Sequence, residues 1–156
     1  MNHARRTFIK GAGAAGTVAV AVAAGLLRPT EVLAAEWNKA AFEAKAVADA
    51  LKAMGASTPA DSKDIQIKAP DIAENGAVVP VEVTSKIAGT EAIALLVEKN
   101  ATPLAADFTL ANGAEGYIST RIKMGQTSNV RVVVKAGGKY YAAVKEVKVT
   151  IGGCGG

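Results

Sequence analysis

The chain has 156 residues, enough for one domain with a modest hydrophobic core, and its formal net charge is +4. Half of the residues are hydrophobic but only 4% are aromatic, so aliphatic side chains must form most of the core. The chain holds one histidine, His3, and one cysteine, Cys154. This composition excludes an intramolecular disulfide, zinc sites with several Cys or His ligands, iron–sulfur sites and c-type haem sites.

The N-terminus has the features of an export signal. Residues 4–10 read ARRTFIK, and the paired Arg5 and Arg6, followed by an aromatic, an aliphatic and a lysine residue, resemble the twin-arginine (Tat) motif. An uncharged stretch over residues 11–27 follows, and Val32-Leu33-Ala34 places small residues where a signal peptidase requires them. We therefore predict a Tat signal that is cleaved after Ala34 and a mature protein in the periplasm.

The alternatives to this prediction are cleavage after Ala35 and an uncleaved basic helix or membrane anchor. The uncharged stretch is only weakly apolar and is shorter than the roughly 20 residues with which a helix crosses a bilayer. No cysteine follows it closely, which excludes a lipoprotein anchor. We expect no membrane anchor in the mature protein.

Removal of residues 1–34 changes the charge and the available chemistry. It takes away four of the 18 basic and one of the 14 acidic residues, which leaves a net charge of +1. The positive charge is therefore mostly a property of the signal, and we expect no nucleic-acid partner. The signal also contains His3, so the mature chain has no Ser/His/Asp triad, no Cys/His dyad and no evident metal site.

The first element expected in the mature chain is an amphipathic helix over Glu36–Met54. Gly55 and then Pro59 are suitable residues to end it. Trp37 and Phe42 are expected to pack on a core rather than to bind a ligand. Apolar residues recur at steps of three and four, at positions 37, 41, 44, 47, 51 and 54.

From residue 65 onward the hydrophobic pattern has a period of two, which is typical of strands. Turn residues such as Gly137-Gly138 separate about seven short strands, and Pro80 indicates a strand start or a sheet edge. We therefore predict an immunoglobulin-like antiparallel β-sandwich over residues 35–151, with the helix beside it and an open barrel as the main alternative. The expected strands lie around residues 65–68, 79–84, 93–97, 108–110, 117–124, 130–134 and 141–151.

The chain ends in the sequence IGGCGG, and residues 152–156 form an unusual tail. Four glycines surround Cys154: Gly152, Gly153, Gly155 and Gly156. Because glycine pays the largest entropy cost on ordering, we expect a flexible arm that can enter a narrow channel in another protein. The thiol then suits covalent carriage of a group on which other enzymes act, and activation must come from their sites. The alternative is a frayed end whose cysteine is incidental or links two copies.

These features together resemble the SoxY family, the sulfur-carrier subunit of the periplasmic Sox thiosulfate-oxidising system. The resemblance covers the whole chain, and the terminal Gly-Gly-Cys-Gly-Gly is its most specific part. Three internal stretches also look like family sequence: AENGAVVPVEV (73–83), STRIKMGQTS (119–128) and VKAGGKYY (134–141).

The resemblance implies that Cys154 is the attachment point for sulfur and that the four tail glycines form the arm. A c-type cytochrome would join thiosulfate to the thiol, a hydrolase would release sulfate, and a sulfane dehydrogenase would oxidise the remaining sulfur. This chain would be a non-catalytic carrier without a cofactor, and it would be exported in a complex with a SoxZ-like subunit. Such a partner would explain the apolar strands 91–97 and 130–134 as an interface, with burial in the core as the alternative.

Three other functions compete with the carrier. A ubiquitin-like sulfur carrier also ends in Gly-Gly, but it works in the cytosol through its terminal carboxylate. A periplasmic immunoglobulin-like module could use Cys154 for an intermolecular disulfide. An enzyme is the weakest alternative, because acidic residues such as Asp61 and Asp64 are typical of solvated loops.

Overall fold

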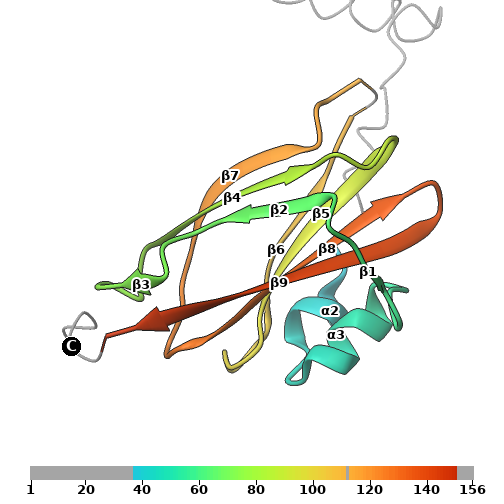
Figure 1. Cartoon of the computed structure of the whole chain (residues 1–156). Helices are drawn as coiled ribbons and strands as arrows, with labels where there is room; N and C mark the ends of the chain where they lie inside the picture. The colour runs from blue at the N-terminus through green and yellow to red at the C-terminus, as the bar shows by residue number, and fades with distance from the viewer. Residues whose placement is uncertain (1–36, 112, 151–156) are drawn as a thin grey trace, which may run out of the picture. The chain divides into compact units, whose positions relative to one another are not determined.

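The computed structural model describes residues 37–111 and 113–150 (Figure 1). The chain divides into two units, Met1–Trp37 and Asn38–Gly156, and every helix and strand named below belongs to the second. Across the described residues, no helix has the length and apolar character to cross a membrane.

The strands form two separate open sheets, which confirms the predicted sandwich and not the barrel. The larger sheet has the order β1-β9-β8-β5-β6 with β3 also paired to β9, and the smaller has the order β2-β4-β7. Within residues 37–111 and 113–150, seven strands have four residues or more, as expected. The bounds are β1 (Ala60–Asp61), β2 (Ile65–Lys68), β3 (Ile72–Ala73), β4 (Val79–Ser85), β5 (Thr90–Val97), β6 (Leu104–Thr109), β7 (Tyr117–Ile122), β8 (Ser128–Ala136) and β9 (Lys139–Val149).

All pairs between these seven longer strands are antiparallel, but the two-residue strands β1 and β3 pair with β9 in parallel. Pro80 is the second residue of β4 and lies beyond the end of β2, so its missing N–H disturbs no pairing with that strand. Gly137 and Gly138 have φ values of 55° and 72° in the tight turn between β8 and β9, a conformation that favours glycine.

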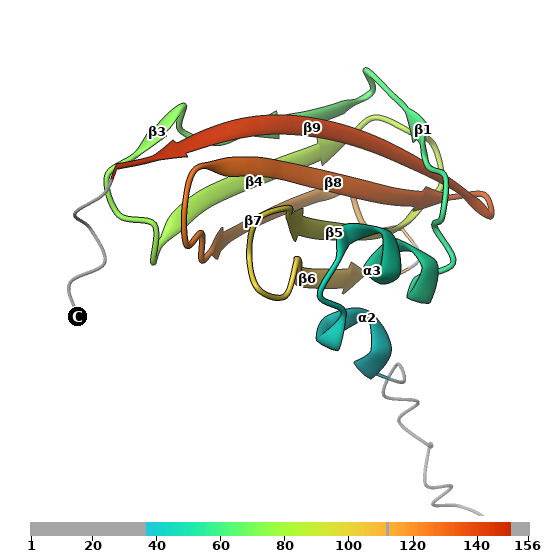
Figure 2. The ribbon, with the colours of Figure 1, turned by 90° about the horizontal axis from the view of Figure 1, so that it is seen from below.

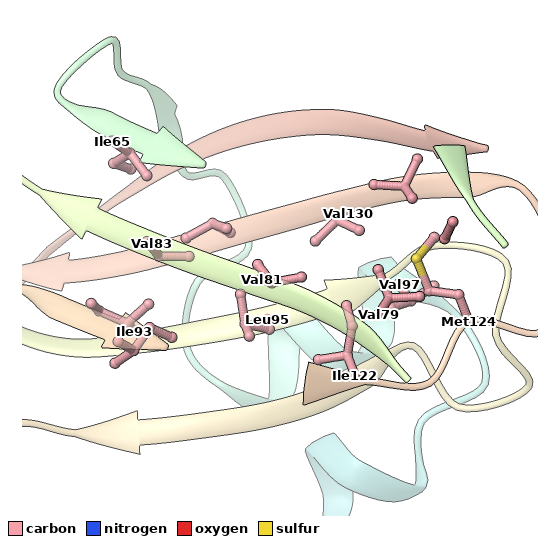
Figure 3. Close-up of a cluster of buried hydrophobic side chains, with 14 of the residues drawn as sticks. Ile65, Val79, Val81, Val83, Ile93, Leu95, Val97, Ile122, Met124 and Val130 are labelled. Carbon is pink, nitrogen blue, oxygen red and sulfur yellow. The ribbon is translucent and has the colours of Figure 1, made fainter. Parts of the chain in front are cut away.

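The core of the sandwich consists of aliphatic side chains from alternate positions of facing strands (Figure 3). Complete burial of a leucine or valine side chain stabilises the fold by about 1.5–3 kcal/mol. The central strands β4, β5 and β8 contribute Val79, Val81, Val83, Ile93, Leu95, Val97, Val130, Val132 and Val134, all with no exposed surface.

The outer face of the larger sheet is covered by helices α2 (Lys39–Glu43) and α3 (Val47–Ala53), as Figure 2 shows. Ala94 and Leu96 of β5 and Val133 of β8 pack there against Ala41, Ala50 and Leu51. Strand β5 is therefore buried on both faces, which explains its continuous apolar sequence. The interpretation of strands 91–97 and 130–134 as an interface is wrong for these buried residues, because this chain itself covers them.

The prediction of one helix over Glu36–Met54 is wrong, because the chain breaks between Ala44 and Ala46. Both residues have extended backbone, with ψ values of 139° and 147°. The break lets the Asn38 Nδ2 donate a hydrogen bond to the Ala53 carbonyl at 2.8 Å. In one straight helix these two residues would be about 22 Å apart. Two short helices therefore fit the outer face of the sheet where one long helix would extend past it.

The two aromatic residues of this region differ in their surroundings. Phe42 is partly buried against the hydrophobic cluster between the helices and the larger sheet, as expected. The side chain of Trp37 is 65% exposed, so the prediction that it packs on the core is wrong. Its position just before α2 explains the difference, because the helix begins only at Lys39.

Candidate functional site

The predicted site residues Cys154, Gly152, Gly153, Gly155 and Gly156 lie outside the described residues, and so do Arg5 and Arg6 of the export motif. The structure does describe the chain up to residue 150, which is the base from which the glycine tail continues. We call the last described part, residues 147–150, the root of the tail. Its contacts define what the folded domain contributes to the site.

On one side the root pairs with strand β3, beside the C-terminal end of β9 in Figures 1 and 2. The Lys148 amide donates to the Asp71 carbonyl at 3.0 Å, and the Thr150 amide donates to the Ala73 carbonyl at 3.1 Å. The two hydrogen bonds enclose Lys148 and Val149, the residues of β9 that pair with β3. They hold the backbone of the root one residue beyond the end of the strand.

On the other side the root is held by a side chain. Strand β8 begins at Ser128, which pairs with Val147 and leaves Val149 without a main-chain partner in β8. The Thr127 hydroxyl takes that place: it accepts from the Val149 amide at 2.9 Å and lies 3.4 Å from the Val149 carbonyl oxygen. A threonine with one donor and two lone pairs can make both contacts.

Close packing of the main chain at Gly76 against Met124 also holds the root in place. The Gly76 carbonyl accepts from the Met124 amide at 2.7 Å. A Cβ atom added at Gly76 would overlap the Met124 carbonyl oxygen and lie 2.8 Å from Cγ1 of Val149. Only glycine fits this position without a shift of the main chain.

The root limits where the predicted thiol can act. Cys154 follows Thr150 by four residues, and a fully extended chain spans at most about 3.3–3.6 Å per residue. The cysteine is therefore within about 14 Å of Thr150 in every conformation of the tail. The domain supplies a fixed anchor, and the tail supplies a short reach.

The sequence did not single out Thr127, Gly76 or the 71–78 segment as parts of this site. The stretch 73–83, which contains Gly76, was noted only for its resemblance to family sequence. The Asn75-Gly76 dipeptide was the available signal: Asn75 Oδ1 accepts from the Ala77 amide at 2.9 Å, as in a tight turn. That this turn packs on the end of β9 depends on contacts between segments about 70 residues apart.

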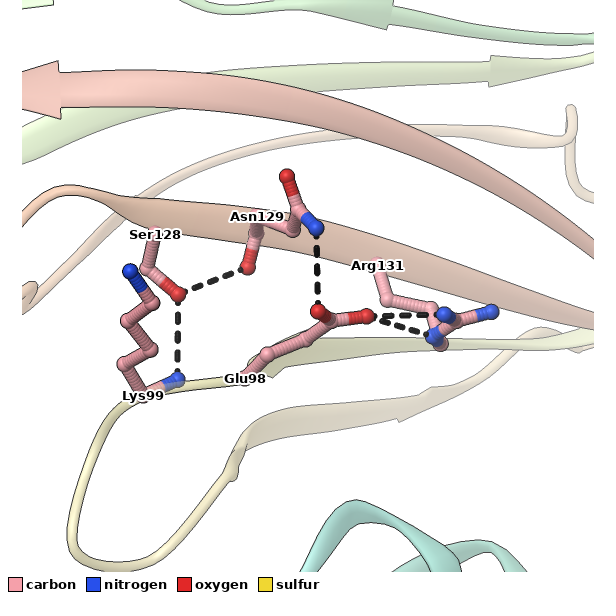
Figure 4. Close-up of polar contacts among 5 residues, drawn as sticks. All are labelled: Glu98, Lys99, Ser128, Asn129 and Arg131. Atoms are coloured by element: carbon pink, nitrogen blue, oxygen red, sulfur yellow. Dashed lines mark hydrogen bonds and ion pairs between the residues drawn. The ribbon is translucent and has the colours of Figure 1, made fainter.

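A polar cluster joins the end of β5 to the start of β8 (Figure 4). Oε1 of Glu98 accepts from Nη2 of Arg131 at 2.7 Å and from Nε at 3.0 Å, and Oε2 accepts from Asn129 at 3.0 Å. The Ser128 hydroxyl accepts from the Lys99 amide at 3.0 Å. These bonds connect the loop that follows β5 to the first residues of β8.

The pKa of Glu98 reflects two opposing effects. Partial burial raises the pKa, but the hydrogen bonds from Asn129 and Arg131 and the positive charge of Arg131 outweigh it. The pKa of the carboxyl therefore lies below its usual value. The folded state thus favours the ionised glutamate more than the unfolded state does.

A second acidic group, Asp107, lines a pocket of about 110 Å³ between the helices and the larger sheet. The residue as a whole is exposed, but partial desolvation of its carboxyl raises its pKa. Asp61 and Asp64 are exposed, as expected of solvated residues. No three His, Cys, Asp or Glu side chains among residues 37–111 and 113–150 are grouped so that they could hold a metal ion.

The two open sheets and the helices that cover the larger one place the chain in the class of small β-sandwich domains. A family model described as "Sulfur oxidation protein SoxY" matches residues 50–154, which is about two thirds of the chain. The chain therefore belongs to the SoxY family. The match extends to position 154 and so includes the cysteine.

A solved structure supports the same assignment. The sulfur carrier protein SoxY from Chlorobium limicola f thiosulfatophilum is 48% identical, with a TM-score of 0.60 over 66% of this chain and 94% of that chain. Superoxide reductase (neelaredoxin) from Ignicoccus hospitalis is 17% identical, with a TM-score of 0.49 over 55% of this chain and 80% of that one, and does not bear on function. No curated protein matches the sequence.

Replacement of Gly76 by alanine should destabilise the domain by about 1–3 kcal/mol, because the added methyl group overlaps the main chain of Met124. The Thr150 amide should also exchange its hydrogen faster as the root loosens. Chemical denaturation and amide exchange measure the two effects. Gly125→Ala is the matched control, since the nearest atom to its added Cβ is 3.8 Å away. Equal stability of the two variants would contradict the tight packing at Gly76.

Glu98→Gln should make stability less sensitive to acid. The folded pKa lies below the unfolded one, so the ionised carboxylate stabilises the wild type fully above the usual pKa of about 4.3. This contribution disappears as the pH falls through the folded pKa. The difference in unfolding free energy between wild type and Glu98→Gln should therefore shrink towards low pH. Urea unfolding at several pH values measures it, with the exposed Glu115→Gln as control. A difference in unfolding free energy that stays constant with pH would exclude stabilisation by the ionised Glu98.

Proposed function

We propose that this protein is a covalent sulfur carrier, in which Cys154 holds thiosulfate-derived sulfur and the glycine tail presents it to the enzymes of the Sox pathway. The observation that carries the proposal is that the SoxY family match extends through Cys154. The structure adds an anchored root directly before the tail. A fixed base followed by a short stretch of glycines suits delivery of a thiol into enclosed active sites.

The proposed chemistry starts with oxidation of the thiol and thiosulfate together. The Cys154 thiol loses a proton, the pair loses two electrons to a c-type cytochrome, and an S–S bond forms to give Cys–S–S–SO3⁻. Water then attacks the terminal sulfur in a hydrolase, which releases sulfate and leaves the persulfide. A sulfane dehydrogenase oxidises the outer sulfur to give Cys–S–SO3⁻, with water as the oxygen source and a c-type cytochrome as the acceptor of the six electrons. A second hydrolysis releases sulfate and restores the thiol.

In this scheme the chain itself catalyses no step, and its contribution is positional. The proposed partners are a SoxZ-like subunit, which forms a stable complex with the chain, and the three enzymes, which bind transiently. No nucleic acid, membrane anchor or cofactor enters the proposal. The residues on either side of Cys154 are glycines without charged side chains, so they do not activate the thiol. In the proposal, the active site of each partner enzyme activates it.

The first test is intact-mass spectrometry without reductant on protein from the periplasm of cells grown with thiosulfate. We expect mass increments of one or two sulfur atoms, a sulfonate or a thiosulfonate, lost with reductant and mapping to the C-terminal peptide. Cys154→Ser should lose every increment and abolish thiosulfate oxidation. Its thermal unfolding and its binding to the partner subunit should not change, because the cysteine lies beyond the root.

Two outcomes oppose the carrier. Normal thiosulfate oxidation by Cys154→Ser excludes it. An unmodified thiol, or only a disulfide-linked dimer that disappears with reductant, favours the structural module with an intermolecular disulfide.

We also propose export through the Tat pathway with cleavage after Ala34. The family match covers residues 50–154, so removal of residues 1–34 leaves the matched region intact. Replacement of Arg5 and Arg6 by lysine should leave the uncleaved precursor in the cytoplasm, because the export machinery reads the arginine pair. Cell fractionation and N-terminal sequencing measure this. Unchanged export of the double variant, or a mature N-terminus that begins before residue 35, would overturn the proposal.

A further inference from the structure

We propose that the exposed side chains of Ile72 and Val78 form a docking surface for the enzymes that act on Cys154. The inference rests on the proposed carrier function and adds the place at which partners bind. Both residues belong to the 71–78 segment, which holds the root of the tail. The occupant is the apolar rim of the channel through which a partner enzyme admits the tail.

Ile72 is presented outward by its strand. It pairs in register with Lys148 of β9, while the next residue, Ala73, is only 4% exposed and packs in the core. Because side chains alternate across a strand, Ile72 must point away from the core, and its side chain is 58% exposed. It therefore stands beside the root on the solvent side, where β3 lies next to β9 in Figure 2.

Val78 occupies the other end of the same segment. It is 50% exposed, although Val79 beside it is completely buried. It lies two residues from Gly76, whose position against Val149 fixes this turn on the root. Five large hydrophobic residues are exposed within the described part of the chain, and two of them belong to this eight-residue segment. Apolar exposure is therefore concentrated where the tail begins.

The reach of the tail determines what must cover this segment. Cys154 is within about 14 Å of Thr150, so an enzyme that encloses the thiol has its channel mouth close to the root. A standard interface covers about 800 Å² on each partner, which corresponds to a patch roughly 30 Å across. A patch centred on the tail therefore includes both Ile72 and Val78. The length of the tail and the point at which it begins therefore indicate that a partner enzyme covers these two side chains.

The segment is also rigid enough to serve as an interface. Hydrogen bonds from Lys148 and Thr150 fix Asp71 and Ala73, and Lys145 forms an ion pair with Asp71 at 3.0 Å. A surface that is already ordered loses little conformational entropy on binding. Two apolar side chains on such a base can supply binding energy without a change of fold.

The experiment uses the full chain, purified with any subunit that it retains and loaded without any enzyme. The Cys154 thiolate displaces thiosulfate from tetrathionate, which leaves Cys–S–S–SO3⁻ on the carrier. A Sox sulfate-releasing hydrolase then converts it with water to the persulfide and sulfate. Initial rates of sulfate release against carrier concentration give KM and kcat.

Replacement of both Ile72 and Val78 by serine should raise KM for the loaded carrier about tenfold and leave kcat within about twofold, because binding is weakened and the chemistry is not. The increase should persist at high salt, since the lost contacts are apolar. The matched control is Val144→Ser, which removes a side chain of similar exposure, 44%, on the same β9 but six residues before Thr150. Its KM should stay at the wild-type value.

Several results overturn the inference while the carrier function stands. These are an unchanged KM in the double variant, an equal increase in Val144→Ser, or a loss of thermal stability that explains the effect. A changed rate of reaction with tetrathionate shows that the two residues cover the tail itself, and a changed oligomeric state shows that they join two copies. If the wild type cannot be loaded, or the hydrolase does not act on it, the proposed function itself fails.

Discussion

Burial of strand β5 on both faces is the constraint on which the rest of the structure depends. Ile93, Leu95 and Val97 fill the sandwich core, and Ala94 and Leu96 lie under the helices. With no solvent-exposed face in this stretch, β5 fixes the register of β8 beside it, because a slip of one residue would exchange the two sets of side chains. Strand β8 in turn fixes β9, the longest strand, which leads to the tail.

The end of β9 shows how this rigidity reaches the start of the glycine tail. Beyond Val147 the main-chain pairing with β8 stops, and the Thr127 hydroxyl takes its place on that side. On the opposite side two amide hydrogen bonds join the root to the 71–78 segment, in which Gly76 packs closely against Val149. Thr150, the last residue that these contacts hold, is four residues before Cys154 in the sequence. In the proposed carrier, this anchor fixes the point from which the glycine tail begins.

The fold was largely predictable, and the exceptions have specific causes. Alternation predicted the seven longer strands, since each buries one face or two. The 36–54 region has one helical period, but Asn38 bonds to Ala53 and the chain folds back, which no periodicity reveals. The short parallel strands β1 and β3 have too few residues for a pattern. Trp37 was expected to pack on the core because it is apolar and continues the helical spacing, but it lies before the first helix and is exposed.

The sequence by itself determined the chemistry of the candidate site: one cysteine among four glycines, an export motif, and no histidine in the predicted mature chain. These are properties of residue types, so composition and order suffice. Only the tertiary structure decided where the tail is anchored and which side chains surround its root. Ile72 and Val78 lie about 75 residues before the root, and strand pairing and packing alone bring them beside it. Such contacts depend on the register of whole sheets, which local sequence does not encode.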